Sequence, residues 1–362
     1  MPSMIKVLVV DDSALIRQML LRALSVDPRI EVVGTAKTGV EAIEKALTLN
    51  PDVITLDVEM PEMTGTEALP HIIRGTRARV VILSSIDDPD TTYQALSLGA
   101  VDFITKPKAG FATSLSELSE LLLKKIRTAY RVNPDRRMVM RTGAGISPSE
   151  AQAERPRPIV PRLATPAGPL RKVVAFAAST GGPPALEAVF SGLSADLPSA
   201  YLVVQHLPAG FTASLAKRLG KVTDIRVIEG AQGMPIEAGT AYIAPHGTHM
   251  VVEGKKRPRL HLVEGPTIHG VKPAADPLLE SVATVFGSRS VGVVLTGMGS
   301  DGARGLQDIH AIGGATIVQD EETSVVWGMP GAASKIGAVD RVVPLPGIAA
   351  EVRRAVREEV LR

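Results

Sequence analysis

The sequence contains no cysteine, and this absence excludes several kinds of site. Without a thiol the chain has no disulfide framework, no thiolate zinc site and no cysteine nucleophile. The formal net charge is only +2, which provides no overall field for nucleic acid. At the N-terminus, MPSMIKVLVVDD has too short an apolar run for a signal peptide or a membrane-spanning helix. We therefore expect a cytoplasmic protein that binds no nucleic acid and is not inserted in a membrane.

The length and a change of composition predict two domains. A chain of 362 residues, 45% of them hydrophobic, exceeds what one hydrophobic core usually supports. Between about residues 131 and 170, proline is frequent, arginine outnumbers the acidic residues and no aromatic residue occurs. Such a stretch cannot bury much apolar surface and is typical of an extended linker. We predict a first domain at residues 4–128, a linker at 129–170 and a second domain at 171–362.

Both predicted domains alternate short apolar runs with helical patterns. In the first, runs such as IKVLVV and RVVILSS alternate with patterns such as ALIRQMLLRAL; in the second, VVAFAAS and AYLVVQHL alternate with patterns such as DPLLESVATVF. This alternation predicts two α/β domains, each a doubly wound parallel sheet with helices on both faces. We expect a β-hairpin insertion in the second domain near residues 240–264. In such sheets, ligands bind beyond the carboxyl ends of the strands.

Polar side chains follow the predicted strands of the first domain at one edge of the sheet. They are Asp11 and Asp12 after the first strand, Asp57 after the third, Ser84 after the fourth and Lys106 after the fifth. Three carboxylates at one edge would repel one another without a cation, and hard oxygen ligands suit Mg²⁺ rather than zinc. Alone, each residue is more simply a turn, a helix cap or a surface charge. Together they favour a site where a carboxylate attacks a phosphoryl group.

Residues 4 to about 128 resemble a response-regulator receiver domain through the motifs VVDDS, LDVEMP, LSS and TKP. The resemblance implies a flavodoxin-like fold with Asp57 as the residue that is phosphorylated. It makes Ser84 the switch hydroxyl and Lys106 the lysine that contacts the phosphoryl group. The Mg²⁺ ligands that it implies are Asp11, Asp12, Asp57 and the backbone carbonyl of Glu59. A partner histidine kinase would supply the phosphoryl group.

In the second domain, the stretch VVAFAASTGG at residues 173–182 places Ser179 at a strand-to-helix turn. A phosphate-binding loop is disfavoured, because the stretch lacks the lysine of the G-x-x-x-x-G-K-[ST] pattern. On this motif alone, capping of the next helix by Ser179 or Thr180 is the favoured interpretation. A nucleophilic serine would need a base within hydrogen-bond reach, since its hydroxyl is inert near neutral pH without one.

His206 is the best candidate for that base. Among the six histidines of the second domain it alone ends an apolar run, YLVVQH, that should lie beside the strand of Ser179. Its side chain would then reach the same edge of the sheet. His246 and His249, in APHGTHM, leave open a metal pair, although no further ligand cluster accompanies them.

Asp301 is the candidate acid that would orient the base. It lies in VGVVLTGMGSDGARG, after a further predicted strand, although it could simply cap the helix that begins near Gly302. Asp276 and Asp320 are rivals, but Asp276 begins a helical pattern outside the set of strand ends and Asp320 follows a later strand. Glycines in the loop before Asp301 would let backbone N–H groups approach a substrate oxygen, as an oxyanion hole requires.

Residues 171 to about 345 resemble the catalytic domain of the chemotaxis protein-glutamate methylesterase family. The motifs that carry the resemblance are ASTGGP, QHLPAGFTASLAKRL, YIAP, LTGMGSDGARGL and QDEETSVVWGMPGAA. It implies that Ser179 is the nucleophile, that His206 is the general base and acid, and that Asp301 orients His206. It also implies backbone N–H groups of His206 and Met298 as oxyanion donors, with Thr180 assisting. Helix capping then passes to Thr180.

The implied reaction is hydrolysis of γ-glutamyl methyl esters on methyl-accepting chemoreceptors, with deamidation of receptor glutamines as a companion activity. A chemotaxis histidine kinase would phosphorylate Asp57 and thereby release a receiver that packs over the catalytic cleft. Mg²⁺ is the implied cofactor of the receiver, and the catalytic domain needs none. The sequence VKPAADPLL departs from the Arg-Pro-Ser-x-Asp that the family often shows. The competing hypothesis is a response regulator whose second domain only binds a partner, which would not require Ser179, His206 and Asp301 together.

Overall fold

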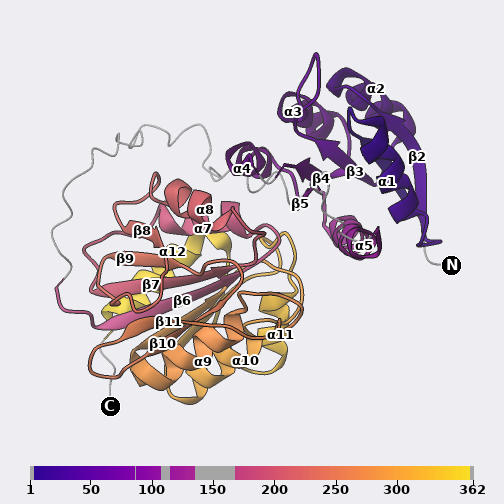
Figure 1. Ribbon diagram of the computed structural model, residues 1–362. Helices are drawn as coiled ribbons and strands as arrows, with labels where there is room; N and C mark the ends of the chain where they lie inside the picture. The colour runs from indigo at the N-terminus through magenta and orange to yellow at the C-terminus, as the bar shows by residue number, and fades with distance from the viewer. Residues whose placement is uncertain (1–3, 86, 107–114, 135–167, 359–362) are drawn as a thin grey trace, which may run out of the picture. The chain divides into compact units, whose positions relative to one another are not determined.

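The computed structural model describes residues 4–85, 87–106, 115–134 and 168–358. The chain divides into two compact units, Met1–Arg141 and Thr142–Arg362, coloured from indigo to yellow along the chain in Figure 1. Most of the predicted linker lies outside the described residues, so its extended character stays a prediction. Each unit is described by itself below.

The first unit contains a five-stranded sheet in the order β2-β1-β3-β4-β5, and all of its strand pairs are parallel. The strands are β1 (Ile5–Val10), β2 (Ile30–Ala36), β3 (Val53–Asp57), β4 (Arg79–Ser84) and β5 (Asp102–Thr105). The helices are α1 (Ala14–Leu24), α2 (Gly39–Leu49), α3 (Gly65–Gly75), α4 (Pro89–Ser97) and α5 (Leu115–Arg131). Helices α1 and α5 contact each other, as do α2 and α3. The strand order is that of flavodoxin-like folds, as the sequence predicted.

Short polar residues begin the helices of this unit. Ser13, Thr38, Thr64 and Asp88 each accept a hydrogen bond from a backbone N–H in the first turn of α1, α2, α3 and α4. Such caps satisfy donors that a helix start otherwise leaves unpaired. Because each helix begins at a capped residue shortly after a strand ends, the polar residues of the strand ends are held at one edge of the sheet.

The second unit is built around a seven-stranded sheet in the order β14-β13-β12-β6-β7-β9-β8, again with parallel pairs only. Its strands are β6 (Lys172–Ala178), β7 (Ser199–Gln205), β8 (Arg226–Glu229), β9 (Thr240–Ile243), β12 (Ser290–Val294), β13 (Ala315–Gln319) and β14 (Arg341–Val343). The chain adds strands on one side of β6 and later, from β12 onward, on the other. Ligands bind at such a reversal, beyond the carboxyl ends of β6 and β12.

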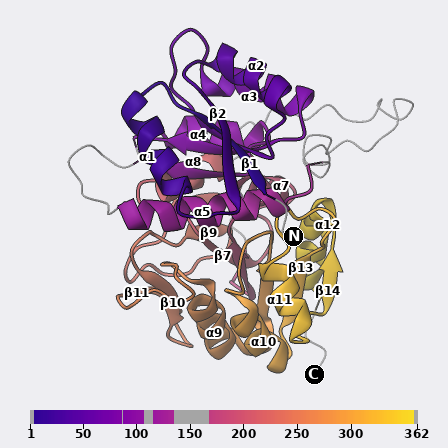
Figure 2. The same ribbon diagram turned by 90° about the vertical axis from the view of Figure 1, so that its right-hand side faces the viewer.

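Helices cover both faces of this sheet, which Figures 1 and 2 show from two directions. They are α7 (Gly182–Phe190), α8 (Thr212–Leu219), α9 (Ala275–Phe286), α10 (Ala303–Ala311), α11 (Met329–Lys335) and α12 (Leu345–Arg357). Helix α10 contacts α9 and α11 on one face, and α7 contacts α8 and α12 on the other. Among the described residues, no helix combines the length and the apolar character needed to cross a membrane.

The predicted hairpin insertion is smaller than expected. The antiparallel pair consists of β10 (His249–Glu253) and β11 (Arg259–Val263). The run TAYI at residues 240–243 was assigned to the insertion, and this was wrong: it forms β9, which lies between β7 and β8 in the main sheet. All four residues of β9 are buried, and a strand buried on both faces belongs in the interior of a parallel sheet.

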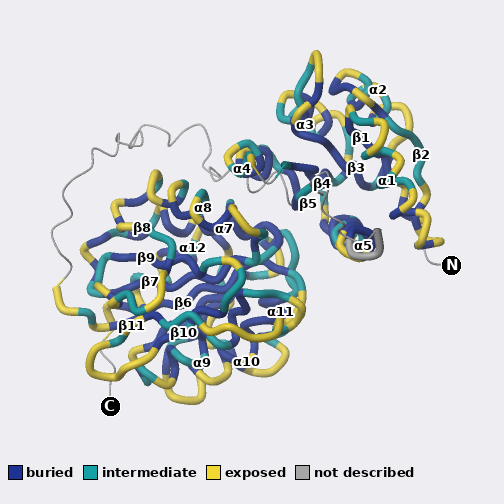
Figure 3. The backbone as a smooth tube through the Cα atoms, in the orientation of Figure 1, coloured by how far each residue is buried: buried dark blue, intermediate teal, exposed yellow. Residues whose placement is uncertain are grey.

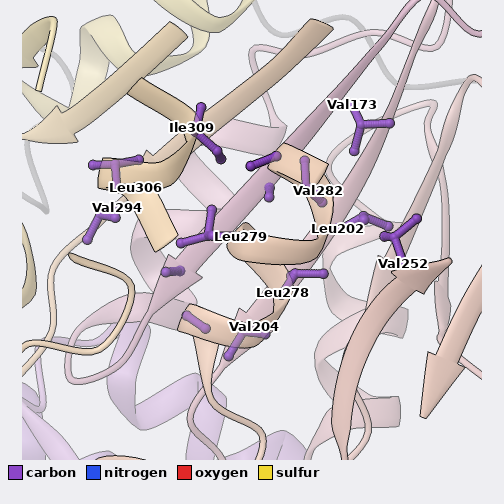
Figure 4. Close-up of a cluster of buried hydrophobic side chains, with 14 of the residues drawn as sticks. Val173, Leu202, Val204, Val252, Leu278, Leu279, Val282, Val294, Leu306 and Ile309 are labelled. Atoms are coloured by element: carbon purple, nitrogen blue, oxygen red, sulfur yellow. The ribbon is translucent and has the colours of Figure 1, made fainter. Parts of the chain in front are cut away.

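One layer of the core of the second unit lies between β6, β7 and β12 and the helices α9 and α10. Figure 3 shows the strands as mostly buried, and Figure 4 shows the side chains that fill this layer. Gly305 lets the two helices approach closely, because a Cβ atom there would lie 2.4 Å from the Cβ of Leu279. The starts of α9 and α10 are therefore brought together beside the carboxyl end of β12.

Candidate active site

Ser179 follows β6, the strand at which the sheet order reverses. Its backbone N–H donates to the carbonyl of Thr296, after β12, at 3.1 Å. Its carbonyl accepts from the backbone N–H of Gly182 at 2.8 Å and from Nε2 of Gln205 at 2.9 Å. The main chain of Ser179 is thus fixed from both neighbouring strands, while its side chain keeps partial access to solvent.

The helix after Ser179 begins differently from the prediction. The N-cap of α7 is Gly181, with φ of +76°, and it provides no side-chain cap. The assignment of Thr180 as the cap was wrong. The chain enters α7 through a residue with left-handed backbone, a conformation that glycine adopts without strain. Thr180 itself is 4% exposed.

His206 follows β7, directly beside β6. Its Nε2 lies 2.8 Å from Oδ2 of Asp301. An ionised carboxylate only accepts hydrogen bonds, so Nε2 carries a proton and Nδ1 remains the basic nitrogen of the neutral ring. Among the described residues, no hydrogen bond joins the Ser179 hydroxyl to this ring; such bonds often form only when substrate binds. The backbone N–H of His206 donates to Ala178 at 3.1 Å, so the expectation that it serves an oxyanion is not supported.

Asp301 lies between β12 and α10, and its side chain is 2% exposed. Besides the bond from His206, it accepts from the backbone N–H groups of Ala275 at 2.6 Å and Asp276 at 3.0 Å. Burial opposes ionisation of Asp301, but these donors outweigh it and hold the pKa of the carboxyl below its ordinary value. The carboxylate also caps a helix, but that helix is α9; the N-cap residue of α10 is Gly302, which has no side chain to cap it.

The loop after β12 passes close to Ser179. A Cβ at Gly297 would lie 2.9 Å from the Cβ of Ser179 and 2.2 Å from Sδ of Met329, so only glycine fits there. Oγ1 of Thr296 donates to the carbonyl of Thr180 at 3.0 Å. The loop that contains Met298 is thus held against the turn after β6. The role of Met298 as an oxyanion donor stays a prediction.

Gln205 was missed by the sequence analysis. It is 1% exposed, and its Nε2 donates to the carbonyls of Ser179 at 2.9 Å and His206 at 3.2 Å. One side-chain amide therefore connects the two residues that the sequence selected as nucleophile and base. A polar residue at the end of an otherwise apolar run, just before the candidate base, was the available signal.

His246 and His249, the two histidines of APHGTHM, do not form the metal pair that the sequence analysis left open. Nδ1 of His246 lies 3.0 Å from the carbonyl of Leu207. His249 is buried, accepts from the backbone N–H of Ala274 at 3.1 Å and donates to the carbonyl of Pro266 at 3.0 Å. Both rings are used to hold the main chain near the site.

The first unit brings the predicted acidic residues together at the carboxyl edge of its sheet. Nζ of Lys106 lies 2.9 Å from Oδ2 of Asp11 and 2.6 Å from Oδ2 of Asp57. Burial and the charge of Asp11 raise the pKa of Asp57 to about 6, against the opposing effect of Lys106. Carboxylate oxygens of Asp11, Asp12 and Asp57 lie within 4.8 Å of one another. A set of close, hard oxygen ligands fits Mg²⁺.

Ser84 lies beside this cluster and is 2% exposed. Its hydroxyl is hydrogen-bonded to that of Thr92 on α4 and donates to the carbonyl of Ser85. A hollow lined by Asp57, Glu59, Ser84 and Lys106, among others, opens at this point. The backbone N–H of Glu59 donates to Oδ1 of Asp57 at 3.3 Å, so the main chain of Glu59 lies beside Asp57.

Known proteins resemble both units. The family model described as CheB methylesterase matches residues 174–352, and the one described as response regulator receiver domain matches residues 7–112. A protein of Pyrococcus horikoshii named protein-glutamate methylesterase/protein-glutamine glutaminase is 45% identical over 99% of this chain and 95% of its own length. One of the same name from Symbiobacterium thermophilum is 43% identical over 98% of both.

A solved structure is similar to the second unit. The catalytic domain of Thermotoga maritima CheB methylesterase is 36% identical and covers 51% of this chain and 97% of its own, with a TM-score of 0.50. The described geometry, the two family matches and the relatives that align along nearly the whole chain agree. The chain therefore belongs to the protein-glutamate methylesterase family that carries an N-terminal response-regulator receiver domain.

Proposed function

We propose that this protein hydrolyses γ-glutamyl methyl esters on methyl-accepting chemoreceptors and is activated by phosphorylation of its receiver. The observation that carries the proposal is the hydrogen bond between His206 and the buried Asp301, formed beside Ser179 where the sheet order reverses. The relatives named protein-glutamate methylesterase/protein-glutamine glutaminase support the choice of substrate. We assign the receiver to residues 4–128 and the catalytic domain to residues 171–362, joined by a linker at 129–170.

In the proposed first step, the Ser179 hydroxyl oxygen attacks the ester carbonyl carbon. Its proton passes to Nδ1 of His206, the ring nitrogen that Asp301 leaves free. The ring becomes an imidazolium, which the ionised Asp301 stabilises through its bond to Nε2–H. The tetrahedral intermediate then collapses: the bond to the methoxy oxygen breaks, and Nδ1–H returns its proton to that oxygen. Methanol leaves and the glutamyl group remains on Ser179 as an ester.

A water molecule completes the reaction by the same steps in the opposite sense. Nδ1 of His206 takes a proton from water as its oxygen attacks the acyl carbon, and the Ser179 oxygen leaves with that proton. The products are a receptor glutamate and the free enzyme. A glutamine side chain enters the same scheme with ammonia as the leaving group, which gives the proposed glutaminase activity. General acid–base catalysis of this kind contributes roughly 10² to 10⁴ in rate.

The negative oxygen of the intermediate needs donors, and we assign this role to the backbone N–H of Met298 with assistance from Thr180. The close approach of the Gly297 loop to Ser179 supports this assignment. Donors aimed at the developing charge are worth roughly 10² to 10³ each.

Regulation is assigned to the first unit. We propose that a chemotaxis histidine kinase transfers a phosphoryl group to Asp57, with Ser84 and Lys106 contacting its oxygens. Asp11, Asp12, Asp57 and the carbonyl of Glu59 would hold Mg²⁺, which supplies positive charge to the phosphoryl group. The pKa of Asp57, raised to about 6 by burial and by Asp11, supports a site whose charge balance is completed by a cation.

The experiment is a methanol-release assay on membranes that contain methylated receptors, with and without a small-molecule phosphodonor. We expect wild-type activity to rise with the phosphodonor. Asp57→Ala should keep the basal rate and lose the rise. Ser179→Ala should release no methanol while remaining folded. An active Ser179→Ala protein would refute the nucleophile, and stimulation that survives Asp57→Ala would refute the switch.

A further inference from the structure

Helices α9 and α10 begin beside each other, and each start is capped by a carboxylate that belongs to the start of the other. Asp301, just before α10, accepts from the backbone N–H groups of Ala275 and Asp276 in the first turn of α9. Oδ1 of Asp276 accepts at 2.9 Å from the backbone N–H of Gly305 in the first turn of α10. The two helix starts are therefore tied crosswise, and the position of Asp301 depends on that of α9.

The two helix starts are packed so closely that neither can shift far relative to the other. A Cβ at Gly305 would lie 2.8 Å from the carbonyl oxygen of Asp276 as well as against Leu279. Because the helix starts touch through backbone atoms, the hydrogen bond from Gly305 to Asp276 fixes the first turn of α9. The same first turn of α9 supplies two of the three donors to Asp301, the backbone N–H groups of Ala275 and Asp276.

A second histidine holds Asp276 from the solvent side. Nε2 of His269 lies 2.9 Å from Oδ2 of Asp276; the side chain of His269 is 41% exposed and that of Asp276 is 1% exposed. His269 and Gly270 have φ of +54° and +74° and form the centre of a tight turn closed by backbone bonds between Ile268 and Val271. Histidine, like asparagine and aspartate, adopts left-handed backbone more often than other residues with a side chain. The turn thus presents the His269 ring to Asp276.

The contact between His269 and Asp276 affects Asp301 because the two carboxylates lie close together. The potential ligand atoms of His269, Asp276 and Asp301 all lie within 4.8 Å of one another. Two buried carboxylates so close repel each other unless each is held by its own donors. His206 and the start of α9 serve Asp301, and His269 and the start of α10 serve Asp276. Arg304, which pairs with Glu280, also interacts electrostatically with Asp276.

We propose that Asp276 and His269 form a second histidine–carboxylate pair that holds Asp301 in line with His206. Asp276 is a positioning residue: it acts through the first turn of α9 and does not touch the ester. His269 fixes Asp276 by one hydrogen bond from a tight turn with left-handed backbone. The proposal rests on the proposed function for its kinetic test only, because the bond between His206 and Asp301 can be followed without substrate.

The sharpest variant is His269→Asn. Asparagine suits the left-handed turn, so the unfolding temperature should stay equal or rise, while the shorter side chain gives up the bond to Asp276. We expect kcat for methanol release to fall about tenfold with KM within a factor of about two, since small misplacements of catalytic groups are costly. His261→Asn, at another partly exposed histidine on β11, is the matched control and should leave both constants unchanged.

Asp276→Ala should lower kcat about a hundredfold, and Asp276→Asn, which keeps an acceptor for Gly305, should recover part of that loss. In parallel, the low-field proton NMR signal of His206 Nε2–H, assigned by its loss in His206→Gln, should move upfield or broaden in Asp276→Asn and His269→Asn. Wild-type kcat together with an unchanged signal in both variants would overturn the proposal, as would a loss confined to KM. A wild-type protein that releases no methanol would refute the proposed function, while the signal would still decide the positioning role.

Discussion

Asp57 and Asp301 are both aspartates at strand ends with almost no exposed surface, yet their surroundings shift their pKa values in opposite directions. Asp57 is 1% exposed, and burial together with the charge of Asp11 outweighs Lys106 and raises its pKa to about 6. Asp301 is 2% exposed, but bonds from His206 and from two backbone N–H groups overcome the effect of burial and lower its pKa. Burial alone does not decide the charge of a carboxylate; the donors aimed at it and the charges beside it also do.

The difference matches the chemistry that each site is proposed to perform. A carboxylate whose negative charge is incompletely compensated attracts a cation, and with the cation present it can accept a phosphoryl group. A carboxylate that backbone donors keep ionised provides a permanent charge for an imidazolium that forms and disappears in each cycle. Two sheets of the same class thus place similar residues at the same edge and obtain different functions from the groups around them.

The largest expected effect comes from breaking the bond between Asp301 and His206. In Asp301→Asn the side chain can donate to Nε2, which favours the tautomer with the proton on Nδ1, so the proposed basic nitrogen of His206 is lost. We expect kcat to fall by about 10⁴, as for other histidine–carboxylate pairs, with KM little changed. Methanol release and circular dichroism of the same preparation are the measurements. Retention of more than about a tenth of wild-type kcat would contradict the assignment of Asp301.

Asp57→Asn should act on stability instead. The pKa of Asp57 is about 6 in the folded state and 3.8 in the reference state, so between these values the folded chain binds more protons than the unfolded chain. The free energy of unfolding therefore falls as pH rises through this window and stays low above it. Removing the carboxylate should stabilise the first unit by up to about 3 kcal/mol at pH 7 and by almost nothing below about pH 4. Urea denaturation with EDTA at both pH values tests this; equal gains at both would contradict it.

The parts of the sites that the sequence predicted follow from one rule. Parallel strands end at a common edge, so Asp11, Asp57 and Lys106 had to meet once their strands were recognised, and so did His206 and Asp301. Apolar runs broken by short polar residues identify strand ends without knowledge of packing. The contacts at 2.6 to 2.9 Å among these groups confirm that they come together.

The parts that the sequence did not predict depend on helix starts and backbone conformation. Asp276 was set aside because it begins a helix, yet its place in the first turn of α9 brings it to Asp301. Thr180 was expected to cap α7 because side-chain caps are common, whereas the chain enters the helix at Gly181 through positive φ. The run at residues 240–243 is as short as a hairpin strand, and only its burial between β7 and β8 distinguishes it.

A smaller effect on kcat is expected from Gln205→Met. Methionine has a similar length but no donors, so the carbonyls of Ser179 and His206 lose the amide that joins them. Ser179 keeps its bond from Gly182, which limits the displacement. We expect about a tenfold fall in kcat and a loss of stability of about 1 to 2 kcal/mol. Gln232→Met, on the exposed side of the unit, is the control; identical kinetics for the two variants would exclude a role for Gln205.

The smallest expected effect concerns the binding of Mg²⁺ by the acidic cluster of the first unit, which consists of Asp11, Asp12 and Asp57. Lys106 occupies the oxygens of Asp11 and Asp57 at 2.9 and 2.6 Å, so it competes with Mg²⁺ electrostatically. Lys106→Met should therefore bind Mg²⁺ about five times more tightly at low salt, because one nearby positive charge is worth about 1 kcal/mol at a partly exposed site. Lys125→Met, whose ammonium pairs with Asp102 at 2.6 Å outside the cluster, should bind as the wild type does. Titration calorimetry measures both, and weaker binding in Lys106→Met would show that the lysine helps to build the site that it was expected to oppose.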